Sequence, residues 1–138
     1  MKKRIMQNHQ KMAHTARVKL TIHGEERFFG PGIWELLERI RATGSIQAAA
    51  AEMKMSYTKA WRIINRAEKE MGVNLITRVS GGRNGGSSSL TEAGETAVRA
   101  FREMERKLSE EAERLMKTYG ASFMPVVHGQ EEEAGRER

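Results

Sequence analysis

Four basic side chains in the stretch 56–71 have the charge and the spacing to bind a polyanion. These are Lys59, Arg62, Arg66 and Lys69. They recur every three or four residues, so a helix of about 100° per residue places them on one face. The opposite face is apolar and carries Tyr57, Ala60, Trp61, Ile64, Ala67 and Met71. Such a helix is shaped to press onto an anionic groove, with DNA as the first candidate; the alternative is a basic face that meets only solvent.

Both ends of this helix carry capping residues. Ser56 can accept a hydrogen bond from the free backbone N–H groups of the first turn. Gly72 can adopt the left-handed conformation that ends the last turn. The helix is therefore predicted to begin after Ser56 and to end at Gly72.

The segment before this helix predicts two supporting helices. Residues 33–40 carry apolar side chains at helical spacing and predict a first helix, which Gly44 ends. Ser45 then caps a short helix at 46–53 that contains four consecutive alanines. Small side chains let two helix axes approach closely, as a helix-turn-helix requires, although helix propensity alone could also explain the alanines. Lys54 and Met55 would form the turn.

Short strands are predicted on both sides of the three helices. Polar and apolar residues alternate at 17–23, and residues 27–29 end in two phenylalanines. Together these two segments predict a small hairpin. Residues 74–79 predict a strand, 80–89 a glycine-rich loop, and Leu90 the end of the return strand. This is the outline of a β-wing, which can follow the phosphate backbone or enter the minor groove. The alternative is a disordered linker between two domains.

This order of elements assigns a role to each polar side chain of the candidate surface. The first turns of a recognition helix reach base edges, so Thr58, Lys59 and Arg62 are expected to read bases. Arg66 and Lys69 lie further along the helix and are expected to meet phosphates. The complete set of expected DNA-binding residues is Ser56, Tyr57, Thr58, Lys59, Arg62, Arg66, Lys69 and Arg83, of which Arg83 lies in the glycine-rich loop.

Two further residues of the same helix are interpreted separately. Trp61 lies at the centre of the apolar set and is assigned to the core. Asn65 lies beside the basic row, and its role is left open.

The last helix is predicted to be longer than the domain can cover. Thr91 caps it, and it extends to Tyr119, about 42 Å at 1.5 Å per residue. Its apolar residues follow an eleven-residue repeat, which keeps them in one nearly straight stripe. A domain of ~100 residues has a radius of gyration near 13 Å, so a second copy is expected to cover the far half. The expected dimerisation residues are Phe101, Met104, Leu108, Leu115 and Tyr119; the alternative is a solvated end beyond Leu108.

The length, charge and composition of the chain exclude several classes of protein. The 138 residues suffice for one domain with extensions, and the net charge of +6 is uneven, with +6 in 1–24, +3 in 25–90 and −3 in 91–138. The absence of cysteine excludes a disulfide, a thiolate nucleophile and a cysteine zinc site, and fits a reducing cytoplasm. No apolar run approaches about 18 residues, and the start lacks the apolar run of a secretory signal.

An enzyme is the least favoured class. The histidines (His9, His14, His23 and His128) are scattered, and no carboxylate pair or metal-ligand spacing stands out. A non-specific architectural DNA-binding protein and a winged-helix protein-interaction module stay open as alternatives. We expect a disordered basic arm at 1–15, a DNA-binding domain at 16–90, a dimerisation helix at 91–119 and a disordered tail at 120–138.

Several short motifs occur together between Phe29 and Gly94. They are FGPG at 29–32, TGSI at 43–46, Ser56-Tyr57 followed by Ala60-Trp61, paired glycines at 81–82 and 85–86, and LTEAG at 90–94. Together they resemble the DNA-binding half of ModE-type molybdenum-responsive transcription regulators. LysR-type regulators show similar forms of the second and last motifs.

The order of elements predicts a mainly α-helical α+β fold. The resemblance implies a winged helix-turn-helix that binds operator DNA as a homodimer. In that family a molybdate-binding domain usually follows this half. About 20 residues follow the long helix here, too few for such a domain, so no cofactor is expected in this chain and molybdate is implied by the family alone. Lys54 stands where the family tends to have glycine, and a left-handed backbone there would cost roughly 1 kcal/mol.

Overall fold

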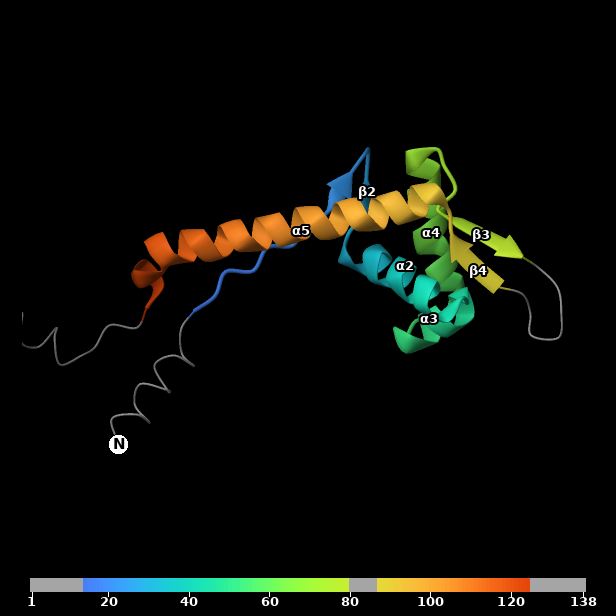
Figure 1. The fold of residues 1–138 in the computed structure, drawn as a ribbon, viewed down its shortest axis with the longest axis horizontal. Helices are drawn as coiled ribbons and strands as arrows, with labels where there is room; N and C mark the ends of the chain where they lie inside the picture. The colour runs from blue at the N-terminus through green and yellow to red at the C-terminus, as the bar shows by residue number, and fades with distance from the viewer. Residues whose placement is uncertain (1–13, 80–86, 125–138) are drawn as a thin grey trace, which may run out of the picture. The chain divides into compact units, whose positions relative to one another are not determined.

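The computed structural model describes residues 14–79 and 87–124 and shows a mainly helical α+β fold (Figure 1). Its elements are β1 (Ile22–His23), β2 (Arg27–Phe29), α2 (Pro31–Thr43), α3 (Ile46–Glu52), α4 (Tyr57–Met71), β3 (Ile76–Val79), β4 (Ser87–Leu90), α5 (Glu92–Tyr119) and a 3-10 turn (Gly120–Phe123). Contacts divide the chain into two compact units, Lys19–Arg106 and the remaining terminal segments. The first unit contains all of the winged helix-turn-helix.

Helices α2, α3 and α4 form the predicted helix-turn-helix. Helix α2 ends at Gly44, whose φ is 74°, and Ser45 caps α3 by accepting a hydrogen bond from the backbone N–H of Ala48 at 3.1 Å. Lys54 in the turn between α3 and α4 has a φ of 56°. The turn is therefore left-handed at a non-glycine residue, at the expected cost of about 1 kcal/mol.

The core of this unit lies where the three helices meet. The side chains of Leu36, Leu37 and Ile40 from α2 are wholly buried, as is Ile64 from α4. Ala49 of α3 and Ala60 of α4 are also wholly buried. Because both are alanines, the two helices of the motif can approach closely, as the alanine run predicts.

The first half of α5 closes the core from another side, and this corrects one prediction. Phe101 is only 1% exposed, and its ring lies 5.3 Å from that of Phe29 and 6.1 Å from that of Trp34. The expectation that Phe101 contacts a second copy is wrong in this structure, because the hairpin and α2 of its own chain already cover it. The apolar stripe of α5 thus begins as core, and its large side chains beyond Phe101 are exposed.

The wing is a two-stranded antiparallel hairpin with a longer return strand than predicted. Ile76 pairs with Leu90 and Val79 with Ser87, so 87–89 belong to β4 rather than to the loop. The hydroxyl groups of Thr77 and Ser89 lie 2.7 Å apart across the strands, and the backbone N–H of Ser88 donates to Gly44 at 2.8 Å. These bonds hold serines in a strand despite their weak strand propensity. The loop 80–86 lies outside the described residues.

The amino-terminal hairpin is shorter than predicted. Only Ile22–His23 pairs with Arg27–Phe29, and residues 17–21 are not in a strand. Val18, which alternation assigned to the buried side, is exposed. Within 14–79 and 87–124, no helix is long and apolar enough to cross a membrane.

A close contact at Gly94 ties α5 to the wing and makes a testable prediction. A Cβ atom added at Gly94 would lie 2.3 Å from the carbonyl oxygen of Leu75, which cannot move aside as a flexible side chain can. Gly94→Ala should therefore lower the free energy of unfolding by about 1–2 kcal/mol net, although alanine normally favours a helix. Chemical denaturation measures the change.

Gly32→Ala in α2 is the matched control for this prediction. A Cβ atom at Gly32 meets no atom within 4 Å, so the same substitution should leave stability unchanged or slightly raised. Equal effects of the two substitutions would contradict the steric explanation.

Candidate nucleic-acid interface

Helix α4 turns one face to the core and the opposite face to solvent. Ala60, Ile64 and Ala67 form the wholly buried row, and Ser56 caps the helix by accepting a hydrogen bond from the backbone N–H of Lys59 at 3.0 Å. Gly72 ends the helix with a φ of 70°. Both predicted caps are confirmed, and they determine which side chains face outward.

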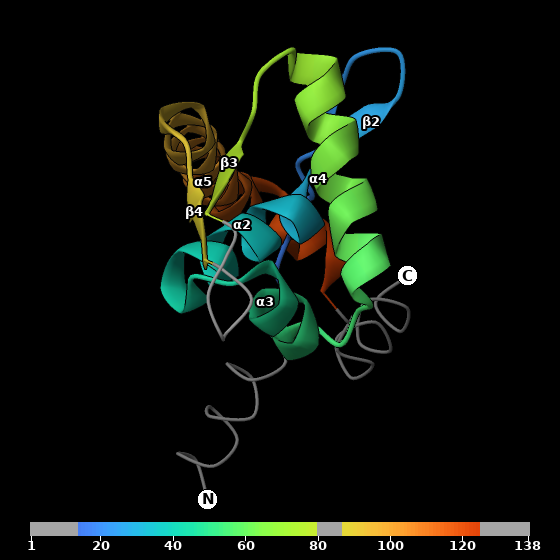
Figure 2. The same cartoon turned by 90° about the vertical axis from the view of Figure 1, so that its right-hand side faces the viewer.

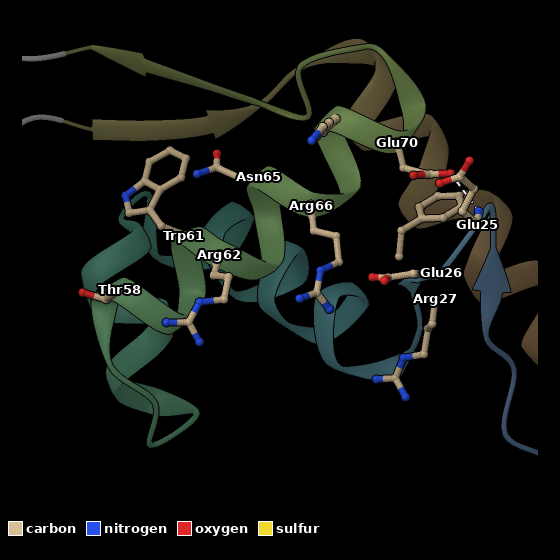
Figure 3. A pocket seen from close by; sticks show the side chains of 11 residues that line it. Glu25, Glu26, Arg27, Thr58, Trp61, Arg62, Asn65, Arg66 and Glu70 are labelled. Carbon is tan, nitrogen blue, oxygen red and sulfur yellow. Dashed lines mark hydrogen bonds between the residues drawn. The ribbon is translucent and has the colours of Figure 1, made fainter.

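A groove of about 720 Å³ runs along the outer face of α4, between this helix and the turn of the β1–β2 hairpin (Figure 3). Figure 2 shows β2 beside the later turns of α4. The residues that line the groove are Glu25, Glu26, Arg27, Phe28, Thr58, Trp61, Arg62, Asn65, Arg66, Lys69 and Glu70. In Figure 3 the guanidinium groups of Arg62 and Arg66 project from α4 in the same direction.

The two ends of the groove differ in charge. Glu25, Glu26 and Glu70 gather where the hairpin turn meets the end of α4, and the backbone N–H of Glu25 donates to Glu70 at 3.3 Å. Thr58 and Arg62 lie toward the start of the helix, away from these carboxylates (Figure 3). The start of the groove is therefore positively charged, whereas at its end three carboxylates offset the charge of Arg66, Lys69 and Arg27.

The cations of the groove differ from several arginines of the scaffold, such as Arg39, Arg41 and Arg102, which form ion pairs. Among residues 14–79 and 87–124, no ion pair forms at Arg62, Arg66 or Lys69. On the scaffold, Arg41 donates to Glu95 at 3.1 Å, and this hydrogen bond lowers the pKa of the Glu95 carboxyl group. Unpaired cations in one groove are available to an external anion without first breaking an internal contact.

The structure brings together in one groove half of the residues expected to bind DNA. Thr58, Arg62, Arg66 and Lys69 line the groove, and so does Asn65, whose role was open. Lys59 is exposed but does not line the groove, and Ser56 and Tyr57 are exposed at the start of α4. Arg83 lies outside the described residues.

Trp61 does not belong to the centre of the core as predicted. It is half-buried and lines the groove, because the buried row of α4 is centred on Ala60, Ile64 and Ala67. Its ring meets that of Tyr57 edge to face at 6.3 Å. Trp61 packs against the core from its border, so its assignment to the core is confirmed in part and only its central position is wrong.

Two basic residues of this surface were not predicted from the sequence. Arg27 on β2 lines the groove, and Arg78 on β3 places its guanidinium carbon 4.1 Å from the centre of the Trp61 ring. Strand alternation could have indicated Arg78, since it lies two residues after the buried Ile76 and so on the same side of β3.

Comparison with known proteins agrees with this geometry. Residues 33–95 match the model of the bacterial regulatory helix-turn-helix protein, lysR family. This segment is a LysR-type helix-turn-helix domain. The match begins within α2 and includes α3, α4 and both strands of the wing, so the groove lies on the segment that matches this regulator family.

Curated relatives extend the likeness to ModE proteins. The chain is 34% identical over 93 residues to the molybdenum transport protein ModE of Herbaspirillum seropedicae, which is 67% of this chain and 33% of that protein. It is 38% identical over 80 residues to ModE of Azotobacter vinelandii, covering 58% and 30% of the two chains. The DNA-binding transcriptional dual regulator ModE of Escherichia coli is 31% identical over 87 residues, which is 62% of this chain and 33% of that protein. The chain thus spans about a third of the length of these relatives.

Proposed function

We propose that this chain is a sequence-specific transcription regulator of the ModE type that binds operator DNA as a homodimer. The observation that carries the proposal is the outer face of α4, where unpaired cations alternate with Thr58 and Asn65 on the second helix of a LysR-type motif. Cations alone would bind any polyanion. The interspersed polar side chains supply hydrogen bonds that distinguish base edges.

Roles within the groove follow from side-chain chemistry and position. Arg62 suits the O6 and N7 atoms of guanine, Asn65 suits the N6 and N7 atoms of adenine, and Thr58 can bond to a base or touch a thymine methyl group. Lys69 lies in the last turn of α4, next to Glu70, so it is assigned to a phosphate at the rim of the DNA groove. Lys59 remains a proposed contact of the first turn, beside rather than within the groove.

The start of α4 and the wing would complete the contact. The Ser56 cap leaves N–H groups of the first turn able to meet a phosphate, and the exposed hydroxyl group of Tyr57 can donate to one. Arg66 is assigned to a phosphate, as is Arg83 in the loop between β3 and β4. These contacts fix the orientation of the helix, and the base contacts give the sequence preference.

The homodimer is proposed from exposed apolar side chains. Met104, Leu108, Leu115 and Tyr119 on α5 are 38–61% exposed. Met104 also lines a wholly apolar groove with Ile22, Phe28 and Ala97. Large apolar side chains repeated along one helix favour burial against a second copy of that helix, and a two-fold dimer would contact two equivalent half-sites.

The experiment that tests this proposal is selection of bound fragments from random-sequence duplexes at about 150 mM salt. Enrichment of a two-fold symmetric site is the expected result. Binding that depends on salt but enriches no sequence would favour an architectural DNA-binding protein instead. A chain that binds no duplex would favour the protein-interaction module.

The same selection, repeated with molybdate, tests the link to the relatives' names. Those names mention molybdenum, but this chain spans only a third of the relatives. No cofactor is assigned to the described residues, so the enriched site and its affinity should be the same with and without molybdate. A change in either would assign molybdate sensing to this chain.

A further inference from the structure

One side-chain contact joins the wing to the recognition helix. Arg78 lies on β3 and pairs with Ser88 of β4, whereas Trp61 lies on α4. The guanidinium carbon of Arg78 lies 4.1 Å from the centre of the Trp61 ring, within the range of a cation–π contact. Two elements that would both approach DNA are therefore coupled by one pair of residues.

The contact leaves the hydrogen-bonding groups of Arg78 available. A guanidinium group has five N–H donors, and no hydrogen bond of the Arg78 side chain forms within the described residues. Arg78 is exposed, and it forms no ion pair within 14–79 and 87–124. Contact with Trp61 also restricts the rotamers of Arg78, so less side-chain entropy is lost when an external acceptor binds.

The position of Arg78 indicates which acceptor it would meet. Trp61 borders the α4 groove beside Thr58 and Asn65, so Arg78 lies at the wing side of the row assigned to bases. When a recognition helix occupies the major groove, side chains at its flank face the sugar–phosphate backbone rather than base edges. An arginine with free in-plane donors matches a phosphate group in charge and in geometry.

We infer that Arg78 binds a backbone phosphate of the DNA and that Trp61 is the positioning residue that holds it there. The inference rests on the proposed function, because it requires that the α4 surface bind DNA. It gives Trp61, half-buried at the border of the groove, a role beyond packing. It also adds to the interface a strand residue that belongs to neither the recognition helix nor the glycine-rich loop.

The first test measures the affinity of the purified full chain for the selected duplex and for a scrambled duplex over a range of salt concentrations. Arg78→Ala should weaken binding to both duplexes by about fivefold at 150 mM salt, because one phosphate contact is lost. The slope of log affinity against log salt should fall by about 0.9. Arg99→Ala, which removes an exposed arginine of α5 outside the groove, is the matched charge control and should leave both quantities nearly unchanged.

The second test separates positioning by Trp61 from its packing. Trp61→Leu should weaken DNA binding by about two- to fivefold when Arg78 is present and have no further effect in the Arg78→Ala background. Trp61→Phe retains a ring and should recover most of the affinity. The folded fraction of each variant, measured by circular dichroism, corrects the affinity for any loss of stability.

Three outcomes would overturn the inference. Unchanged affinity and salt slope in Arg78→Ala, with normal binding by the unsubstituted chain, would refute it and leave the proposed function intact. Loss of affinity for the selected duplex alone would identify a base contact instead of a phosphate contact. Failure of the unsubstituted chain to bind either duplex would overturn the proposed function together with the inference.

Discussion

Replacing Phe101 with alanine is expected to lower the free energy of unfolding by about 3–5 kcal/mol. The ring of Phe101 is 1% exposed and packs against Phe29 of the hairpin and Trp34 of α2. Removing it leaves a cavity at the point where three elements meet, so both the transfer free energy and the packing contacts of the ring are lost. Chemical denaturation followed by tryptophan fluorescence measures the loss, because Trp34 lies beside the substituted ring.

Met104→Ala is the matched control, one turn further along the same helix. Met104 is 45% exposed, so its truncation should cost the isolated chain less than about 1 kcal/mol. In the proposed dimer it should instead weaken self-association, measured by sedimentation equilibrium. A large loss of monomer stability in Met104→Ala, or a negligible one in Phe101→Ala, would contradict the assignment of Phe101 to the core and of Met104 to the exposed stripe.

Helix ends were predictable from the sequence because they depend on local hydrogen bonds. Ser45 and Ser56 each bond to a backbone N–H three residues on, and Gly44 and Gly72 each adopt a left-handed conformation. Neither feature needs a distant part of the chain. The order of the helices and the presence of a wing follow from such local signals.

Which apolar residue is covered could not be predicted, because burial depends on what packs against it. Phe101 and Met104 belong to one stripe in the sequence, yet only Phe101 meets the hairpin and α2. The same limit applies to β4, where 87–89 read as loop until Ser88 and Ser89 bond to Gly44 and Thr77. Periodicity predicts which side chains share one face of an element. Whether that face is buried or exposed depends on its tertiary contacts.

Some residues of the candidate site could be predicted from the sequence, and others could not. Thr58, Arg62, Arg66 and Lys69 were identified correctly as one surface because a single helix carries them all. Arg27 and Arg78 come from strands outside this helix. Alternation places Arg78 on the same side of β3 as Ile76, but no local pattern shows that β2 and β3 contact α4. Contributions to a binding surface from several elements become visible only in the fold.

Arg62→Ala is expected to cost about 1–3 kcal/mol of binding free energy on the selected site and to relax the preference at one base pair. Arg62 lies in the first half of α4, lines the groove and has no ion pair among the described residues, so its guanidinium group is free to bond to a guanine edge. The measurement is the affinity for the selected duplex and for every single-base variant of it. One position should lose its preference while the others keep theirs.

Lys69→Ala is the control that separates base reading from charge. It removes the same charge from the same helix face, but at the end of the groove bounded by Glu25 and Glu70, where DNA would meet it through a phosphate. It should therefore weaken binding to all duplexes about equally and lower the salt slope by about one. If Arg62→Ala behaved in the same uniform way, Arg62 would also be a backbone contact, and sequence reading would have to reside in Thr58, Asn65 or the wing.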